Sequence, residues 1–234
     1  MKGPNVLSRV AAIDNAVPGR VIKDLRAAIT SSQAMKTSDA GTYWYALDTS
    51  PRVLFEHVIH HLRDLVPGGH EFVGAEWWFR ATTTDTGFPF HFDRDEGVRG
   101  SVVSPGMASI LYASHAGGPT VIVAATPSRR AAPRVGIAVH PRPGRFVMFP
   151  GTLLHGVVPA RASRWPRVTM LVNWWRSVPT LERATAHLDP PRRRWRLVHD
   201  GAKTPAVKLE SFDPTRLLSK AAWRDLISKQ ATYR

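Results

Sequence analysis

The sequence predicts a mainly β protein with flanking helices, in which antiparallel strands form a sandwich or barrel like a double-sheet roll. Two observations predict this class. Apolar residues recur at helical spacing in two early stretches, and about eight short apolar segments separated by Gly, Pro and Asp turns follow them. The length of 234 residues suits one such domain with additions. The chain contains no Cys, which excludes disulfides, zinc fingers and thiol nucleophiles, so any metal must be bound by His, Asp or Glu.

Both early helices are predicted from apolar spacing and from a proline in the first turn. In residues 18–35, Pro18 suits that first turn and the apolar residues follow the helical period. Residues 38–50 are expected to form a polar loop interrupted by aromatic residues. The second helix is expected to begin with Ser50 as its N-cap and Pro51 at its first helical position, and to end at a Pro-Gly-Gly sequence.

The β-rich part is expected to begin with a long strand over residues 71–84. Shorter strands are predicted where apolar or β-branched residues lie between turn residues: 97–104, 108–114, 119–126, 134–140, 144–149 and 167–175. Because side chains alternate along a strand, one tryptophan of each pair, at 77–78 and at 174–175, is expected to face inward. Helices packed outside one sheet of a double-sheet roll fit this order.

The chain is predicted to comprise an N-terminal domain over residues 1–180, which includes the two helices, and a basic extension over residues 181–234 that packs on the same domain. An arginine cluster with one tryptophan lies at residues 190–196. A final helix is expected to open at Asp213 or Pro214, and its later apolar positions include Trp223.

The net charge of +14 permits attraction to nucleic acid, anionic lipid or an acidic substrate. Arg-rich usage on a solvated surface explains most of this charge equally well, although a tryptophan among arginines can stack on a base. The N-terminus has no long apolar run typical of a signal peptide, and no segment has the length of a membrane span. We therefore expect a soluble, cytoplasmic protein that does not act at a membrane.

The segment that carries chemistry is His91-Phe-Asp93. On a strand, residues two apart face the same side, so this imidazole and this carboxylate can bind one metal ion. His155 stands out as a third ligand because it begins a predicted strand after a Pro-Gly turn. Two histidines and one carboxylate, with open positions left on the metal, are typical of non-haem Fe(II) oxygenases.

A fourth candidate, Arg167, follows His155 by twelve residues and opens the last predicted strand. Alternation places Thr169 and Asn173 on the same face of that strand. An inward arginine with a nearby hydroxyl can bind a carboxylate, and a buried arginine requires an anion. A dicarboxylate co-substrate would supply one.

Taken in order, these residues resemble the iron(II)- and 2-oxoglutarate-dependent oxygenase superfamily, whose fold is a double-stranded β-helix of the jelly-roll or cupin-like type. The segment ILYASHAGGPTVI is similar to a strand–turn–strand unit of the prolyl-hydroxylase-like branch, and PRPGRFVMFPGTLLHGVVPA is similar to the approach of that branch to its distal histidine. AAIDNAVPGRVIKDLRAAI is similar to the helix before the barrel. The resemblance covers about residues 10 to 178.

This resemblance implies that His91, Asp93 and His155 are catalytic residues that bind Fe(II), which also takes up O2. Arg167, with Thr169, would bind the distal carboxylate of 2-oxoglutarate. Tyr112 lies on the strand where relatives place a hydroxyl near the co-substrate, and Asn173 completes the candidate co-substrate residues. The implied reaction is hydroxylation or desaturation of a small molecule, amino acid or peptide, with succinate and CO2 as co-products.

Two features of the motif bear on the reaction. Asp93 is present, whereas halogenating relatives have a small residue there, which favours hydroxylation, desaturation or demethylation. Asn173 stands where the nucleic-acid demethylase branch has an arginine, which disfavours an AlkB-like activity. The basic composition nevertheless keeps a nucleic-acid-modifying oxygenase open as one alternative. The other alternative is a cupin-like domain that binds a metal or a small acid without turnover.

Overall fold

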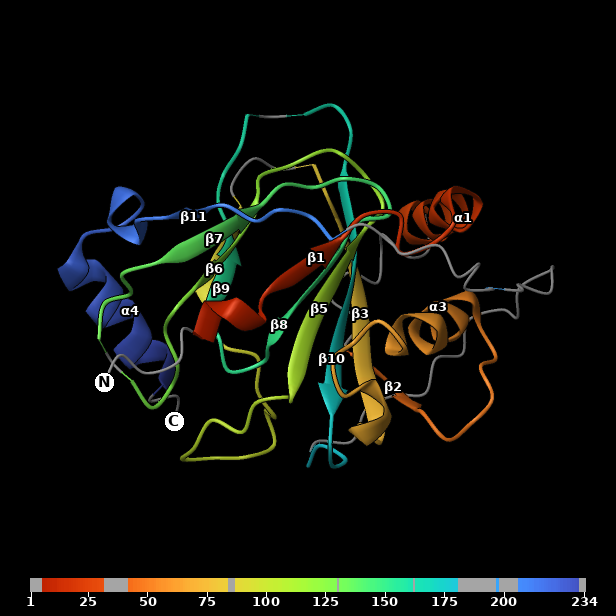
Figure 1. Cartoon of the computed structure of the whole chain (residues 1–234), viewed down its shortest axis with the longest axis horizontal. Coiled ribbons are helices and arrows are strands. Elements are labelled where there is room, and N and C mark those ends of the chain that lie inside the picture. The colour runs from red at the N-terminus through yellow and green to blue at the C-terminus, as the bar shows by residue number, and fades with distance from the viewer. Residues whose placement is uncertain are drawn as a thin grey trace.

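The computed structural model describes residues 6–31, 42–83, 87–129, 131–161, 163–180, 197 and 206–231. Two antiparallel sheets face each other, as Figure 1 shows. The six-stranded sheet has the order β1-β8-β5-β10-β3-β2, and the five-stranded sheet has the order β11-β7-β6-β9-β4. The predicted mainly β, double-sheet architecture is confirmed.

The strands of the six-stranded sheet are β1 (Ala11–Ile13), β2 (Tyr43–Ala46), β3 (Gly74–Thr82), β5 (Met107–Tyr112), β8 (Phe146–Pro150) and β10 (Arg167–Trp175). Those of the five-stranded sheet are β4 (Phe88–His91), β6 (Thr120–Val123), β7 (Gly136–Val139), β9 (His155–Val157) and β11 (Ser211–Phe212). The helices are α1 (Gly19–Thr30), α3 (Leu54–Arg63) and α4 (Lys220–Ala231), with short 3₁₀ turns η1 (Val6–Arg9), η2 (Gly69–Glu71) and η3 (Pro214–Arg216).

Three apolar layers hold these elements together. The first lies between the six-stranded sheet and helices α1 and α3, which cover its outer face in Figure 1, and it includes Leu25, Trp77 and Trp174. The second fills the space between the sheets and includes Tyr112 and Phe149. Trp78 lies on the opposite face of β3 from Trp77, and Trp175 lies on the opposite face of β10 from Trp174. The predicted alternation within each tryptophan pair is therefore confirmed.

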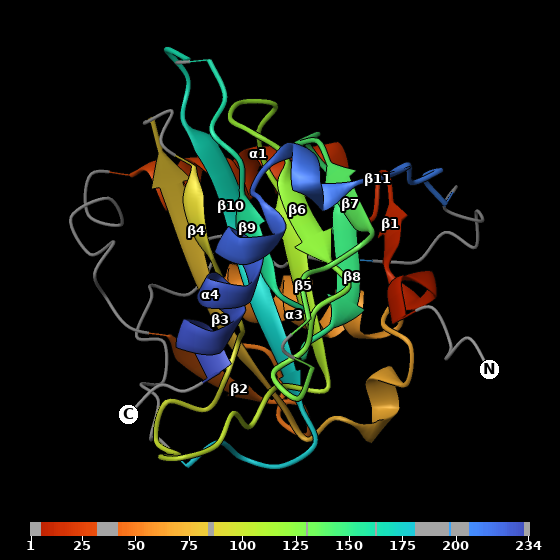
Figure 2. The same cartoon turned by 90° about the vertical axis from the view of Figure 1, so that its left-hand side faces the viewer.

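The third apolar layer joins α4 to the five-stranded sheet. Trp223 and Ile227 of α4 are buried together with Phe92, and the Trp223 ring meets the Phe90 ring edge-on at 5.0 Å between centroids. Figure 2 shows α4 lying across β4 and β9. The end of the chain therefore supports the segment that carries Asp93. The domain boundary near residue 180 stays a prediction, and the arginine cluster at 190–196 lies outside the described residues.

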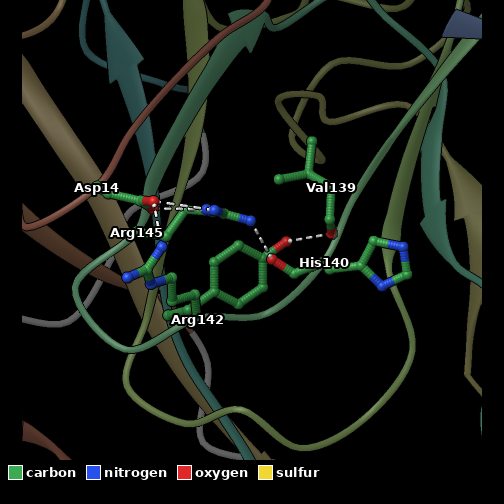
Figure 3. A network of polar contacts seen from close by, with 6 residues as sticks. Asp14, Val139, His140, Arg142 and Arg145 are labelled. Atoms are coloured by element: carbon green, nitrogen blue, oxygen red, sulfur yellow. Dashed lines mark hydrogen bonds and ion pairs between the residues drawn. The ribbon is translucent and has the colours of Figure 1, made fainter. Parts of the chain in front are cut away.

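An ion-pair network ties the start of the chain to the turn before β8. Asp14, directly after β1, accepts hydrogen bonds from Nε and Nη2 of Arg145 at 2.7 and 3.0 Å and from Arg142 at 2.9 Å (Figure 3). Arg145 also donates to the backbone oxygen of His140. The hydrogen bond from Arg145 is the largest of the effects that hold the pKa of Asp14 below its ordinary value.

Several predicted element boundaries were wrong. The expected loop 38–50 contains β2, because its alternating aromatic side chains pack on β3 and Tyr45 is buried. The expected strand 97–104 is a loop, closed by the hydrogen bond from the Asp95 amide to the Val103 carbonyl. The final helix opens later than expected, because Asp213 caps the 3₁₀ turn η3 instead of α4. Among the described residues, no helix has the length and apolar character needed to cross a membrane.

Candidate metal and carboxylate site

The three predicted ligands converge between β4 and β9. His91 ends β4, His155 begins β9, and the two residues are direct partners in the antiparallel register. Asp93 lies in the loop just after β4, so the expectation that it shares a strand with His91 was wrong. Its Oδ1 is 3.5 Å from Nε2 of His91, and its Oδ2 is 3.6 Å from Nε2 of His155. One ligand atom from each residue lies within 4.8 Å of the others.

Backbone carbonyls set the orientation and the tautomer of both imidazoles. Nδ1 of His91 lies 2.9 Å from the Pro89 oxygen, and Nδ1 of His155 lies 3.1 Å from the Leu153 oxygen. A carbonyl only accepts hydrogen bonds, so each Nδ1 carries a proton, and in the neutral form of each ring the lone pair of Nε2 points towards Asp93. Ligand atoms that share an ion at about 2.1 Å stand roughly 3–3.5 Å apart, close to the spacing seen here.

The protonation states also suit metal binding. Burial lowers the pKa of His155 to about 4, so this ring is neutral at pH 7. Burial alone would lower the pKa of His91 as well, but the hydrogen bond and charge of Asp93 raise it overall. Burial would raise the pKa of Asp93, but the facing histidines and a hydrogen bond from Asn173 lower it. The site therefore offers an ionised carboxylate and, once His91 loses its proton, two neutral imidazoles.

A cavity of about 410 Å³ extends from these histidines to Arg167, and we call it the arginine cavity. It lies between the sheets, with His91 and His155 at one end, and its wall also includes Trp78, Arg80, Phe88 and Thr120. Arg167 begins β10 and is only 6% exposed. Its Nη2 donates to Thr120 Oγ1 at 2.9 Å, and its Nη1 reaches Thr169 Oγ1 at 3.5 Å.

The charge of Arg167 has no counter-charge in the part of the chain that the structure describes. No carboxylate there forms an ion pair with it, and its buried Nε has no hydrogen-bond partner. Burial lowers the pKa of this guanidinium, which expresses the cost of the uncompensated charge. A carboxylate that entered the arginine cavity would pair with it. The residues present therefore fit both a metal ion and a carboxylate co-substrate.

Tyr112 and Thr169 support Arg167 from behind. The Tyr112 hydroxyl donates to Thr120 Oγ1 at 2.7 Å, and the Arg167 guanidinium carbon lies 5.3 Å from the centre of the Tyr112 ring. Both Tyr112 and Thr169 are fully buried, and neither is among the residues that line the arginine cavity. Their contact with a co-substrate stays a prediction, whereas Tyr112 contacts Thr120 and Arg167 directly and Thr169 contacts Arg167 directly.

Sequence reasoning missed two contributors to this assembly, Thr120 and Gly117. Thr120 accepts hydrogen bonds from both Tyr112 and Arg167. Gly117 has φ +89°, and a Cβ at this position would stand 2.5 Å from Cδ of Arg167. Glycine therefore gives the turn its conformation and leaves room for the arginine side chain. The Gly-Gly-Pro-Thr sequence was the available signal for both residues.

A second cavity, of about 460 Å³, reaches the metal site from another direction, and we call it the glutamate cavity. Its lining includes Glu76, Trp78, Arg80, Phe88, His91, Phe92, Asp93, Arg94, Glu96, Asn173 and, from α4, Gln230. Asn173, predicted as a co-substrate residue, lies here, and its side chain hydrogen-bonds Asp93. It is not among the residues that line the arginine cavity.

The chain is similar to solved oxygenase structures. A Pseudomonas putida prolyl-4-hydroxylase superposes with a TM-score of 0.52 at 17% identity, over 74% of this chain and 91% of that chain. The viral collagen prolyl hydroxylase of Paramecium bursaria Chlorella virus-1 gives a TM-score of 0.48 at 13% identity, over 75% and 96% of the two chains. HygX from Streptomyces hygroscopicus, with nickel and 2-oxoglutarate bound, gives 0.47 at 14%, over 78% and 89%.

The first of these likenesses confirms the predicted jelly-roll fold, the double-stranded β-helix of prolyl-hydroxylase-like proteins. No family model matches the chain, and no curated protein matches it in sequence. The case for activity therefore depends on the residues of the site.

Proposed function

We propose that this protein is an Fe(II)- and 2-oxoglutarate-dependent dioxygenase that hydroxylates or desaturates a small molecule, amino acid or peptide, and that it acts in the cytoplasm. One observation supports this above all. The Nε2 atoms of two histidines face the two oxygens of one buried carboxylate, and the arginine cavity, which both histidines line, ends at a buried arginine that has no ion-pair partner among the described residues. A metal ion can bind the two histidines and Asp93 at one end, and a carboxylate can pair with the arginine at the other.

Each residue has a defined task in this proposal. His91, Asp93 and His155 hold Fe(II), and the Asn173 hydrogen bond keeps Asp93 ionised and oriented. Arg167, aligned by Thr120, binds the distal carboxylate of 2-oxoglutarate. When bound, the iron and its co-substrate supply oxidation by O2, with succinate and CO2 as co-products. The protein positions the reacting groups and excludes water from the buried end.

Anaerobic titration of the purified protein with Fe(II), followed by 2-oxoglutarate, tests this function. We expect the weak visible charge-transfer band of a chelated keto-acid in the wild type. We expect no band in His155→Ala, because that substitution removes a buried ligand. His60→Ala is the matched control, since His60 is exposed on α3 and should leave the band unchanged.

The outcomes separate the candidate classes. Succinate formation after admission of O2, lost in His155→Ala, supports an oxygenase. A band without any succinate formation would indicate a binding domain without turnover and would overturn the proposal. Fe(II) binding without a band would show that 2-oxoglutarate is the wrong co-substrate.

A further inference from the structure

A second arginine, Arg80, lies where the arginine cavity and the glutamate cavity meet. It belongs to β3, is exposed, and lines both cavities together with Phe88 and His91. Its guanidinium carbon lies 4.0 Å from the centre of the Phe88 ring, and the centre of that ring lies 5.1 Å from the centre of the His91 imidazole. A cationic group that a ligand can reach is therefore one aromatic ring away from a candidate metal ligand.

Arg80 has no counter-charge in the part of the chain that the structure describes. No carboxylate there forms an ion pair with Arg80, and its N–H groups make no hydrogen bond there. The Phe88 ring supports the cation but does not replace a charged acceptor. A guanidinium carries five N–H donors in a planar fork, which matches the two oxygens of a carboxylate. Arg80 therefore keeps its capacity to bind an anion through two parallel hydrogen bonds.

Two charged neighbours act on Arg80 in opposite directions. Partial burial is the largest of the effects that lower the pKa of this guanidinium, the charge of Arg167 lowers it further, and the charge of Asp93 raises it. In the proposed function, Asp93 binds the metal ion and 2-oxoglutarate pairs with Arg167. Both of these anions then have other partners, so the charge of Arg80 is best balanced by an anionic group of a third molecule.

The other acids of the glutamate cavity do not take this role. Glu76 precedes Arg80 by four residues on β3, which corresponds to about 13 Å along a strand. Neither Glu76 nor Glu96 is among the groups whose charge shifts the pKa of Arg80. No carboxylate is among the described residues that line the arginine cavity. An anion next to Arg80 is therefore not opposed by a neighbouring acid once Asp93 has bound a metal ion.

The walls beside Arg80 are aromatic and suit an apolar body. Trp78, two residues earlier on the same face of β3, lines both cavities, and Phe92 lines the glutamate cavity. The volume of the glutamate cavity, about 460 Å³, lies in the range of small-molecule sites. His91 and Asp93 line the same cavity. A compact molecule held at one end by Arg80 would therefore have its apolar part against these rings and beside the candidate metal ligands.

We propose that Arg80 binds the carboxylate of the substrate, and that the substrate class is compact organic acids with an apolar or aromatic body. This inference rests on the proposed function, which fills the arginine cavity with 2-oxoglutarate. The single charge of one guanidinium matches a carboxylate better than the double charge of a phosphate. Arg80 is here a specificity-determining residue: it anchors one end of the substrate and leaves C–H bonds of the apolar body facing the candidate metal site.

Matched pairs of compounds test the inference without knowledge of the natural substrate. Each pair is an acid and its primary amide: cyclohexanecarboxylate with cyclohexanecarboxamide, phenylacetate with phenylacetamide, and hexanoate with hexanamide. Binding is followed by tryptophan fluorescence in the metal-free protein, since Trp78 lines both cavities. The titrations use the wild type and Arg167→Met, because the latter cannot bind the acids at the second arginine. We expect each acid to bind at least fivefold more tightly than its amide in both proteins.

Further variants assign this preference to Arg80. Arg80→Met should abolish it, and the fold should persist because the side chain is exposed and makes no ion pair with a described residue. Arg80→Lys keeps the charge without the planar fork, so the preference should remain with weaker binding. Arg26→Met, at an exposed arginine of α1 that lines neither cavity, is the charge-matched control and should leave the preference unchanged.

Four results would overturn the inference. The first is equal binding of acids and amides in the wild type, and the second is a preference for acids that survives Arg80→Met. The third is a loss of at least tenfold in 2-oxoglutarate affinity in Arg80→Met with the acids unaffected, which would assign Arg80 to the co-substrate. The fourth is tighter binding of phenyl phosphate than of phenylacetate, which would assign a phosphate site.

The visible band with Fe(II) and 2-oxoglutarate is a separate measurement, so the two proposals can fail independently. A protein that shows the band and binds acids and amides equally would refute the substrate class alone. A protein that prefers acids through Arg80 and shows no band would refute the proposed function alone.

Discussion

Replacement of Arg167 by methionine should have opposite effects on stability and on ligand affinity. Methionine has a similar length and no charge. In the ligand-free protein the substitution removes one good hydrogen bond to Thr120, one long contact to Thr169 and the contact of the guanidinium with the Tyr112 ring, worth about 1–3 kcal/mol together. It also removes a buried charge without an ion-pair partner among the described residues, and such a charge costs about 3–5 kcal/mol. The ligand-free variant should therefore be more stable by about 2 kcal/mol.

Thr120 explains why this gain is not cancelled. Its Oγ1 still accepts the hydrogen bond from the Tyr112 hydroxyl after the arginine is gone, so no buried oxygen is left without a partner. At roughly 2–4 °C per kcal/mol for a domain of this size, we expect a rise in the melting temperature of about 4–8 °C.

Affinity for 2-oxoglutarate should fall in the same variant. Loss of one partner from a buried ion pair costs about 3–5 kcal/mol, or roughly 10²- to 10³-fold in Kd or more. Thermal unfolding with and without 2-oxoglutarate, together with calorimetric titration, measures both effects. Arg216→Met, at an exposed arginine on η3, is the charge-matched control. A melting temperature that falls by several degrees, with an affinity within threefold of the wild type, would refute this account of the arginine.

Three further substitutions test other parts of the structure. Asp14→Asn should lower the stability of the protein by about 1–2 kcal/mol at pH 7. Because the folded-state pKa of Asp14 lies below 3.8, the difference in stability between variant and wild type should vanish as the pH falls through the folded-state pKa. Melting curves at pH 7 and at pH 3 or below would show this. Trp223→Ala should lower the free energy of unfolding in urea by about 3–5 kcal/mol, because this side chain is fully buried between α4 and the five-stranded sheet. Trp165→Ala is the control, since that side chain is 65% exposed, and its free energy of unfolding should stay within about 0.5 kcal/mol of the wild type. Gly117→Ala should strain the turn by about 1–3 kcal/mol and weaken 2-oxoglutarate binding by displacing Arg167. Gly100 is the control, because it also has a positive φ but open space around its Cβ position. Gly100→Ala should strain its turn without changing the affinity for 2-oxoglutarate in a calorimetric titration.

The grouping of the candidate metal ligands could be predicted because these residues occur in a recognisable order along the chain. His91-x-Asp93, His155 and Arg167 occur at spacings that an antiparallel roll brings together, and ligand atoms of the three candidate metal ligands lie within 4.8 Å of one another. The prediction placed Asp93 on a strand with His91, and this was wrong. The loop after β4 nevertheless brings the Asp93 carboxylate to 3.5 Å from the His91 imidazole by a different backbone path.

The orientation of the site could not be predicted from spacing. The tautomers of His91 and His155 depend on the carbonyls of Pro89 and Leu153, and Pro89 lies where the register between β4 and β9 shifts. A sequence pattern identifies strands but does not specify such a register shift.

Some features of the glutamate cavity did leave a signal in the sequence. Glu76 interrupts an apolar and aromatic strand, and a charged residue within such a strand indicates a partner or a ligand. No sequence pattern indicates that Gln230 lines this cavity, because its place there depends on how α4 packs across β4 and β9. Tertiary packing of a distant helix has no local pattern.

The charged side chains of the two cavities differ. Arg80 and Arg167 line the arginine cavity, whereas Glu76, Asp93 and Glu96 line the glutamate cavity together with Arg80 and Arg94. An anion that enters the arginine cavity can pair with Arg167, whereas a cation there would be repelled. The arginine cavity therefore favours a carboxylate co-substrate, and the candidate metal site lies where the two cavities meet.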